Sequence, residues 1–350
     1  MPSIKDVAKA AGVSISTVSN TIRGTRYVNE DLKRKVYDAI EKLGYEINTV
    51  ASSLKSKSTH TIGIVIPNMN RIFFPQVIKG IQSYFSKFSY NLMLCDSDDN
   101  LKKEKFFIQM LRNSWVDGII LGSVAQEDDR AYLDYLSTLG TKAKHIPVVS
   151  LEREFPKSGL SSVRVDNYQL GRMATKHLIN CGCKKIAHIM GPQYSCVVKA
   201  RKQGYVDEIK AANMTQKPIF LEGDFSPLSG YQAVKGLFLD KKDVEIDGIF
   251  AGNDQMAIGA LSALREEGIN VPEKVKIAGF DNTFVASIAE PSITTINVPK
   301  YQMGQMVAEL LMKHIENSEA KPQNILLPAN LIVRTSTQLG GDKSWELFGW

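Results

Sequence analysis

The sequence predicts an α/β protein with a two-lobed core of parallel sheets, helices on both faces, and a small all-α domain in front. From Thr61 onward, short continuous apolar segments alternate with segments of helical periodicity. That alternation is typical of parallel strands covered on both faces. Before Thr61, apolar residues recur only at helical spacing, which predicts helices alone. The strands are too many for one compact sheet, so we expect two lobes.

The first two dozen residues predict two short helices joined by a tight turn. Ser3 is a suitable N-cap, and Asp6 completes a capping-box pair with it. Gly12 ends the first helix, Ser14 caps the second, and Gly24 closes it. Such a helix-turn-helix can place its second helix in the major groove of DNA. An ordinary helical hairpin with a polar surface is the alternative.

A third helix is expected over 30–43, with Asn29 as its N-cap and Gly44 at its end. Residues 1–60 hold ten Lys/Arg and six Asp/Glu, a net +4 of the chain's +6. Most of the excess charge therefore lies on the smallest segment, as expected for a module that contacts phosphate. The following Ser-rich stretch, 45–58, is too short for a stable isolated helix and on its own suggests a linker.

The core is predicted to alternate strands and helices. The expected strands are 62–66, 90–95, 118–121, 147–151, 162–165, 185–190, 219–222, 248–251 and 275–279, with later ones within 325–334. The expected helices are 74–88, 101–113, 168–180, 200–212, 229–239 and 254–267. A crossing near 290–300 would return the chain between the lobes.

Polar and aromatic residues follow these strands, where open α/β folds bind ligands. Carboxylates, amides and an Arg around aromatic faces suit a polyhydroxylated ligand, because hydroxyls need donors and acceptors while sugar faces stack on rings. Phe74 as a core residue, Asp254 as a helix cap and Asp281 as a turn residue are the alternatives. The candidates are Asn68, Phe73, Phe74, Arg201, Phe225, Asp254 and Asp281.

Several function classes find no support in the sequence. The motifs GxSxG, GxxxxGK[ST] and HExxH do not occur, so we expect no enzyme and no cofactor. The four cysteines form no CxxC pair, and we expect no metal site. His177, His188 and His314 are interpreted as structural. No apolar run is long enough for a membrane span and the N-terminus has no apolar signal region, so the expected location is the cytoplasm.

Beyond these patterns, the segment IKDVAKAAGVSISTVSNTIRG strongly resembles the N-terminal motif of the lactose/galactose-repressor family of bacterial transcription regulators. The segments TIGIVIPNMN, WVDGIILGS, FAGNDQMAIGAL, KIAGFDNT and LIVRTST also read as landmarks of that family. The resemblance covers roughly residues 3–337 and implies the architecture of periplasmic sugar-binding proteins. The implied domains are a DNA-binding headpiece (1–45), a hinge (46–60), an effector and dimerisation domain (61–340) and an unassigned tail (341–350). The lobes would comprise 61–162 plus 292–325, and 163–291 plus 326–340.

The resemblance implies a homodimer on pseudo-palindromic double-stranded operator DNA. Ile15, Ser16 and Asn20 are the candidate base-reading residues, since Asn can pair with adenine and Ile can touch a thymine methyl. Leu54 matches a hinge leucine that wedges into the minor groove, although Ile47 stands where the family usually has Pro. Supporting base or phosphate contacts are expected from Lys5, Ser14, Thr17, Ser19 and Arg26.

The resemblance also implies a repressor controlled by a small-molecule effector between the lobes. Ser195 and Val197 join the effector candidates by position in the family, and because they are less polar than a purine site requires, a sugar is the expected effector. A phosphoprotein corepressor and a sugar-binding transport component are the alternatives. The sequence names neither the effector nor the operator.

Overall fold

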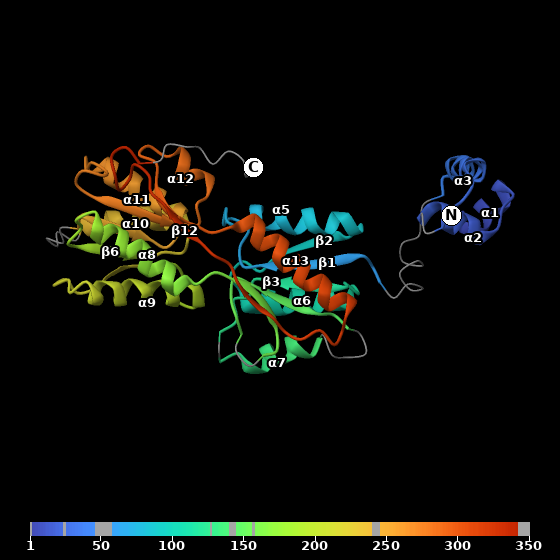
Figure 1. Cartoon of the computed structure of the whole chain (residues 1–350), viewed down its shortest axis with the longest axis horizontal. Coiled ribbons are helices and arrows are strands. Elements are labelled where there is room, and N and C mark those ends of the chain that lie inside the picture. The colour runs from blue at the N-terminus through green and yellow to red at the C-terminus, as the bar shows by residue number, and fades with distance from the viewer. Residues whose placement is uncertain are drawn as a thin grey trace. The chain divides into compact units, whose positions relative to one another are not determined.

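A computed structural model describes residues 2–23, 26–45, 58–126, 128–139, 145–155, 158–239 and 246–341. The chain divides into two compact units, Met1–Thr59 and His60–Trp350 (Figure 1). Among the described residues, no helix is long and apolar enough to cross a membrane. The expected hinge helix and Leu54, like Gly24 and most of the tail, lie outside the described residues.

The N-terminal unit contains three helices: α1 (Ile4–Ala11), α2 (Ile15–Arg23) and α3 (Glu30–Leu43). The predicted capping box is confirmed, because the Ser3 backbone N–H and hydroxyl both donate to the Asp6 carboxylate at 2.8 Å. Ser14 caps α2 by accepting from the Thr17 N–H at 3.0 Å, and Asn29 caps α3 by accepting from the Asp31 N–H at 2.8 Å. The caps are therefore those that the sequence predicts.

The core of this unit is small and apolar. Val7 of α1, Val18 of α2 and Val36 of α3 are each fully buried. Gly12 adopts a left-handed φ of 66° at the end of α1, which a residue with a Cβ adopts only with strain. This glycine lets α2 turn back onto α1, and α3 packs against both.

The second unit is built on two six-stranded sheets. The first has the order β11-β5-β4-β3-β1-β2 and is parallel throughout. Its strands are β1 (Thr61–Ile66), β2 (Asn91–Asp96), β3 (Gly118–Leu121), β4 (Val148–Leu151), β5 (Ser161–Arg164) and β11 (Asn324–Leu326). Helices α5 (Phe74–Phe85) and α13 (Lys300–Glu316) cover one face, and α6 (Leu101–Asn113) and α7 (Arg130–Leu139) cover the other. A short 3₁₀ helix, η1 (Ser86–Phe88), follows α5.

The second sheet has the order β12-β10-β9-β8-β6-β7, in which only β12 is antiparallel. Its strands are β6 (Ile186–Ile189), β7 (Ile219–Leu221), β8 (Gly248–Ala251), β9 (Lys276–Phe280), β10 (Thr294–Asn297) and β12 (Asn330–Ile332). Helices α8 (Asn167–Asn180) and α9 (Cys196–Ala211) cover one face. Helices α10 (Pro227–Leu239), α11 (Asp254–Glu266) and α12 (Phe284–Ile288) cover the other. The predicted two-lobed α/β fold is confirmed.

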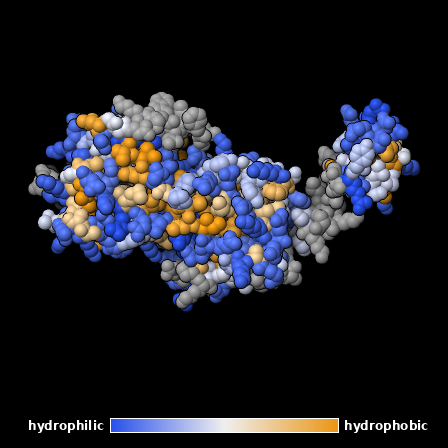
Figure 2. Space-filling view, in the orientation of Figure 1, coloured by the Kyte–Doolittle hydropathy of each residue, from blue (hydrophilic) through white to orange (hydrophobic). Residues whose placement is uncertain are grey.

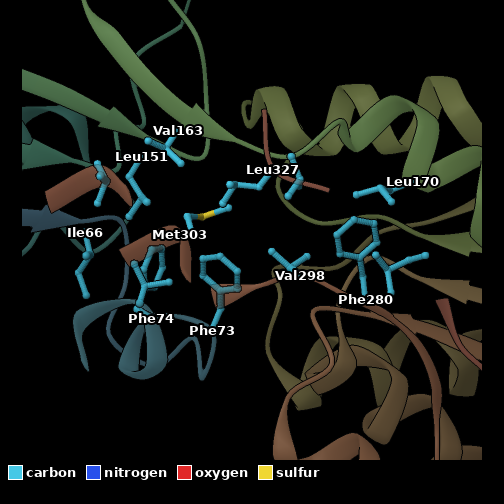
Figure 3. Close-up of a cluster of buried hydrophobic side chains, with 14 of the residues drawn as sticks. Ile66, Phe73, Phe74, Leu151, Val163, Leu170, Phe280, Val298, Met303 and Leu327 are labelled. Atoms are coloured by element: carbon cyan, nitrogen blue, oxygen red, sulfur yellow. The ribbon is translucent and has the colours of Figure 1, made fainter. Parts of the chain in front are cut away.

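The chain passes between the lobes three times, after β5, after β10 and after β11. Val298 and Leu327 lie on two of these crossings and are buried between the lobes (Figure 3). The expected lobe boundary at 292 is wrong, because β10 pairs with β9 and therefore belongs to the second sheet. Likewise β5 keeps 163–164 in the first lobe.

Three helix pairs pack through reciprocal glycines. Gly80 and Gly304 join α5 to α13, Gly171 and Gly204 join α8 to α9, and Gly230 and Gly259 join α10 to α11. At all six positions an added Cβ would lie within 2.6 Å of backbone on the facing helix. The helix backbones therefore approach more closely than any side chain allows, which fixes how each pair sits on its sheet.

Candidate functional site

The cleft between the lobes lies at the carboxyl ends of strands from both sheets. Its volume is about 60 Å³, which is small beside the ~300–1,000 Å³ of typical small-molecule sites. Its charged and aromatic lining comprises Arg71, Phe73, Phe74, Asp99, Glu152, Arg153, Tyr194, Arg201, Phe225 and Asp281. Ser195 and Val197 also line it, as the sequence predicts.

Aromatic rings from both lobes form part of the wall. Phe73 and Phe74 follow β1, pack edge to face with ring centres 5.3 Å apart, and are almost fully buried (Figure 3). From the second lobe, Phe225 adopts a left-handed φ of 74°, a strained conformation for a bulky residue. The Arg71 guanidinium of the first lobe lies 4.7 Å from the centre of the Phe225 ring. The two lobes thus contact each other through a cation–π pair.

Arg201 is held rigidly at the base of the cleft. Its Nε donates to the Asn167 side chain at 2.9 Å, and its Nη1 donates to the Gly252 carbonyl at 2.6 Å. The guanidinium also lies 3.6 Å from the centre of the Phe280 ring. Its Nη2 is 3.9 Å from Oδ1 of Asp281. One nitrogen of Arg201 and the carboxylate of Asp281 are therefore presented together to the cleft.

Burial dominates the electrostatics of this pair. It raises the pKa of the Asp281 carboxyl to about 8, an effect that Asp254 reinforces and Arg201 opposes. Burial also raises the pKa of the Glu152 carboxyl and lowers that of the Arg201 guanidinium. The cleft therefore disfavours a ligand that carries net charge. It favours a neutral ligand whose groups form hydrogen bonds with these side chains.

Five charged or aromatic residues of the cleft lining were not among the candidates chosen from the sequence. Glu152 and Arg153 directly follow β4, so the strand-end rule could have found them. Asp99 lies in the acidic stretch after β2, and its Oδ1 pairs with Arg71 Nη2 at 2.6 Å. Arg71 and Tyr194 stand in loops, and no local sequence pattern marks them.

Two predicted site residues do not line the cleft. The Asn68 side chain donates to Asp99 at 3.2 Å and accepts from the Asn70 N–H at 3.0 Å, so its amide stabilises its own loop. Asp254 is buried and accepts from the N–H and hydroxyl of Thr283 and from the hydroxyl of Thr295. Asp254, which the sequence predicts as an effector contact, therefore does not line the cleft. Asn253 lines the cleft and caps α11.

Gln255 bridges the lobes at the edge of the cleft. The Ile72 N–H of the first lobe donates to its Oε1 at 3.0 Å, and its Nε2 donates to the Asn70 carbonyl at 3.1 Å. One side-chain amide of α11 thus pairs with both a backbone donor and a backbone acceptor of the loop that carries Phe73 and Phe74.

The outward side of α2 carries the predicted DNA-reading residues. Ile15 is 45% exposed although it is apolar, and Ser16 is exposed beside it. Ser19 and Asn20 are half-buried, while Val18 points into the core. The helix therefore presents an apolar tip and short polar side chains, which suit the edges of bases. Thr17 is half-buried and Lys5 and Arg26 are exposed on the same unit.

The histidines have structural surroundings. His188 is buried, stacks on Phe250 with ring centres 4.4 Å apart, and burial lowers its pKa to about 4. His177 contacts the Thr337 hydroxyl, and His314 contacts Ser161. Within the described part of the chain, no group of three or more His, Cys, Asp or Glu residues could hold a metal ion.

Comparison with known proteins identifies the family. A model of "Bacterial regulatory proteins, lacI family" matches residues 3–48, and a "Periplasmic binding protein-like domain" matches residues 175–337. The transcriptional regulator RegA of Clostridium saccharobutylicum is 37% identical over 338 residues, which is 96% of this chain and 99% of that protein. The chain belongs to the lacI family of bacterial regulatory proteins.

One further relative and one solved structure are similar to most of this lacI-family regulator. It is 33% identical to the ribose operon repressor of Halalkalibacterium halodurans over 347 residues, covering 98% of this chain and 99% of the other. A crystal structure of a LacI-family regulator from Enterococcus faecium with bound ribose is 28% identical, with a TM-score of 0.69, and covers 79% of this chain and 98% of its own. This lacI-family protein is accordingly a transcriptional repressor. Its N-terminal unit binds DNA, and its α/β unit binds a small molecule.

Proposed function

We propose that a neutral monosaccharide bound in the cleft controls this repressor. The observation that carries the proposal is the pairing of Arg201 with Asp281, 3.9 Å apart at the base of the cleft. A sugar hydroxyl can donate to a carboxyl oxygen of Asp281 while it accepts from the guanidinium of Arg201. Because other hydrogen bonds fix Arg201, a vicinal diol would meet a preformed donor and acceptor.

The charges favour a neutral ligand over a phosphorylated one. Arg71 is already paired with Asp99 at 2.6 Å, so its charge is compensated within the protein. Glu152 and Asp281 line the cleft together with Arg153 and Arg201. A phosphate would be repelled by the two buried acids wherever they are ionised, whereas hydroxyl groups can bond to either sign.

The relatives support a pentose as the first probe. The Enterococcus faecium regulator was solved with bound ribose, and the Halalkalibacterium relative is a ribose operon repressor. Phe74 and Phe225 line the same cleft and supply apolar faces on which a sugar ring can stack.

For DNA recognition, we propose that α2 enters the major groove and that Ile15, Ser16 and Asn20 contact base edges. Leu54 is proposed to insert into the minor groove between the half-sites. Leu54→Ala should weaken operator binding without changing sugar affinity, because the two sites use different residues. The proposed supporting contacts come from Lys5, Ser14, Thr17, Ser19 and Arg26.

The repressor is proposed to act as a homodimer, which a pseudo-palindromic operator requires. In the first lobe, the edge strand β2 exposes Met93 (36%) and Leu94 (41%). In the second, Ile288 of α12 and Leu228 of α10 are 49% and 62% exposed, and Figure 2 shows apolar side chains gathered over α11 and α12. Exposed apolar edges and patches of this kind favour pairing with a second copy. Sugar binding would change lobe closure and so the spacing of the two headpieces.

The test is a thermal-shift screen of the full chain with ribose, ribose 5-phosphate and a free purine base. We expect ribose or another neutral sugar to raise the melting temperature by mass action. Asp281→Asn should lose that shift, while Asp207→Asn, at a half-buried carboxylate of α9 whose hydrogen-bond partners are Tyr168 and Gln203, should retain it. A shift with the phosphate or the purine alone would refute the neutral sugar. No shift with any compound would favour a phosphoprotein corepressor.

A further inference from the structure

Glu104 is a fully buried carboxylate outside the cleft. It lies in the first turn of α6 and is 0% exposed. Its Oε1 accepts from the Ser123 hydroxyl at 2.6 Å, and its Oε2 accepts from the Val124 backbone N–H at 2.7 Å. Both donors belong to the loop that follows β3, and both residues line the cleft. The carboxylate therefore holds one wall of the effector site from behind.

The same loop holds Arg153. The Ala125 N–H donates to the Ser123 hydroxyl at 3.0 Å, and the Ala125 carbonyl accepts a hydrogen bond from Arg153 Nη1. The Arg153 guanidinium stacks 4.2 Å from the centre of the Phe155 ring. Arg153 is 93% buried and lines the cleft, and its Nε has no hydrogen-bond partner among the described residues. A chain of contacts thus runs from Glu104 through the loop to an Arg with an unused donor.

We propose that Glu104 is a positioning residue for effector recognition, which fixes the Ser123–Ala125 loop and through it the guanidinium of Arg153. This inference rests on the proposed function, because it names a residue that sets affinity for the same cleft ligand. A buried donor without a partner is unfavourable in the protein alone. A ligand oxygen at Arg153 removes that penalty only if the loop holds the guanidinium in place.

A carboxylate is suited to this position. Glu104 meets one hydroxyl donor and one backbone donor, one on each oxygen, and an ionised carboxylate consists of acceptors alone. An amide keeps one acceptor and replaces the other with a donor, which the Ser123 hydroxyl can accept only by reorienting. Burial raises the pKa of Glu104, while the bonds from Ser123 and Val124 lower it. Tyr132 and the charge of Arg153 lower this pKa as well, so the loop is one of several groups that stabilise the ionised carboxylate.

The experiment measures ribose affinity by calorimetry for the full-length wild type, Glu104→Gln, Glu104→Ala, Arg153→Ala and the double variant Glu104→Ala/Arg153→Ala. We expect Glu104→Ala to bind roughly tenfold more weakly and Glu104→Gln to lie between it and the wild type. In the Arg153→Ala background, Glu104→Ala should cause no further loss, since the residue acts through Arg153. Glu208→Ala is the matched control, because Glu208 is also buried but pairs with Arg172 at 2.9 Å between α8 and α9.

Three results would overturn the inference. They are wild-type affinity in Glu104→Ala, an equal loss in the Arg153→Ala background, and an equal loss in Glu208→Ala. If Glu104→Ala does not fold, the comparison of Glu104→Gln with the wild type in both Arg153 backgrounds decides instead. If the wild type itself binds no sugar, the proposed function fails and this inference fails with it, an outcome distinct from the other three.

Discussion

Gly259 allows α10 and α11 to pack backbone against backbone, and Gly259→Ala tests how much that approach contributes. An added Cβ would lie 1.9 Å from the Pro227 carbonyl oxygen and 2.7 Å from the Tyr231 nitrogen. Non-bonded heavy atoms prefer about 3.5 Å, so the helices must separate by about 1.5 Å, and a gap of even 0.5–1 Å already forfeits a quarter to a half of the contact energy. Because the added methyl group overpacks this contact, we expect the free energy of unfolding to fall by about 3 kcal/mol. The melting temperature should fall by roughly 6–10 °C as a result.

The matched control is Gly236→Ala in α10, the other helix of this pair. No atom lies within 4 Å of its added Cβ, so alanine should stabilise the helix by about 0.5–1 kcal/mol. Melting followed by circular dichroism compares the two variants. Gly259→Ala should also weaken sugar binding, because Phe225 precedes α10 and Asn253 precedes α11. If Gly259→Ala melts with the wild type or above it, the close approach is not needed and the reasoning is wrong.

Three further outcomes are expected. Gln255→Ala removes two bonds between the lobes, each worth about 0.5–1 kcal/mol, and should weaken sugar affinity about 5- to 30-fold by calorimetry; unchanged affinity would show that the amide does not stabilise the bound state. The pKa of Asp281 is raised to about 8, so the folded state keeps a proton that the unfolded state loses above about pH 4. Stability should therefore fall as pH rises from 4 to 8, and Asp281→Asn should flatten that fall in urea unfolding at pH 5 and 8; an identical slope in both proteins would contradict this. Asn29→Ala removes the cap of α3 and should destabilise the headpiece by about 1 kcal/mol, seen as earlier loss of its amide-exchange protection; unaltered protection would exclude a role for the cap.

The sequence predicted the elements whose signals are local. Ser3, Ser14 and Asn29 cap the helices where their side chains suggested, because a cap depends on the residues within one turn. The buried strands were found for a similar reason: both of their faces are covered, so they read as continuous apolar runs. Helices α7, α12 and α13 were not among the predicted elements, and α13 follows the crossing that was expected near 290–300.

The cleft was predicted less completely than the fold. Residues next to a strand end, such as Asp281 directly after β9, could be found from the order of strands alone. Arg71 and Tyr194 could not, because their loops reach the cleft only once the two lobes face each other. Asp254 is the opposite case: its position after a strand suggested a ligand contact, but its carboxylate accepts hydrogen bonds from Thr283 and Thr295 and does not line the cleft. Which polar groups are already satisfied is a tertiary property that one sequence does not reveal.

The three crossings between the lobes also determine the order in which this protein can fold during synthesis. The first sheet lacks its edge strand β11 until residue 326 has been made, and one of its covering helices is α13. The second sheet waits for β12, at 330–332. Neither lobe can therefore be completed while the ribosome is still making the body of the chain, unlike domains that fold one after another from the N-terminus. Long-range pairing of this kind slows folding, and truncation shortly before residue 324 would leave both lobes unfinished.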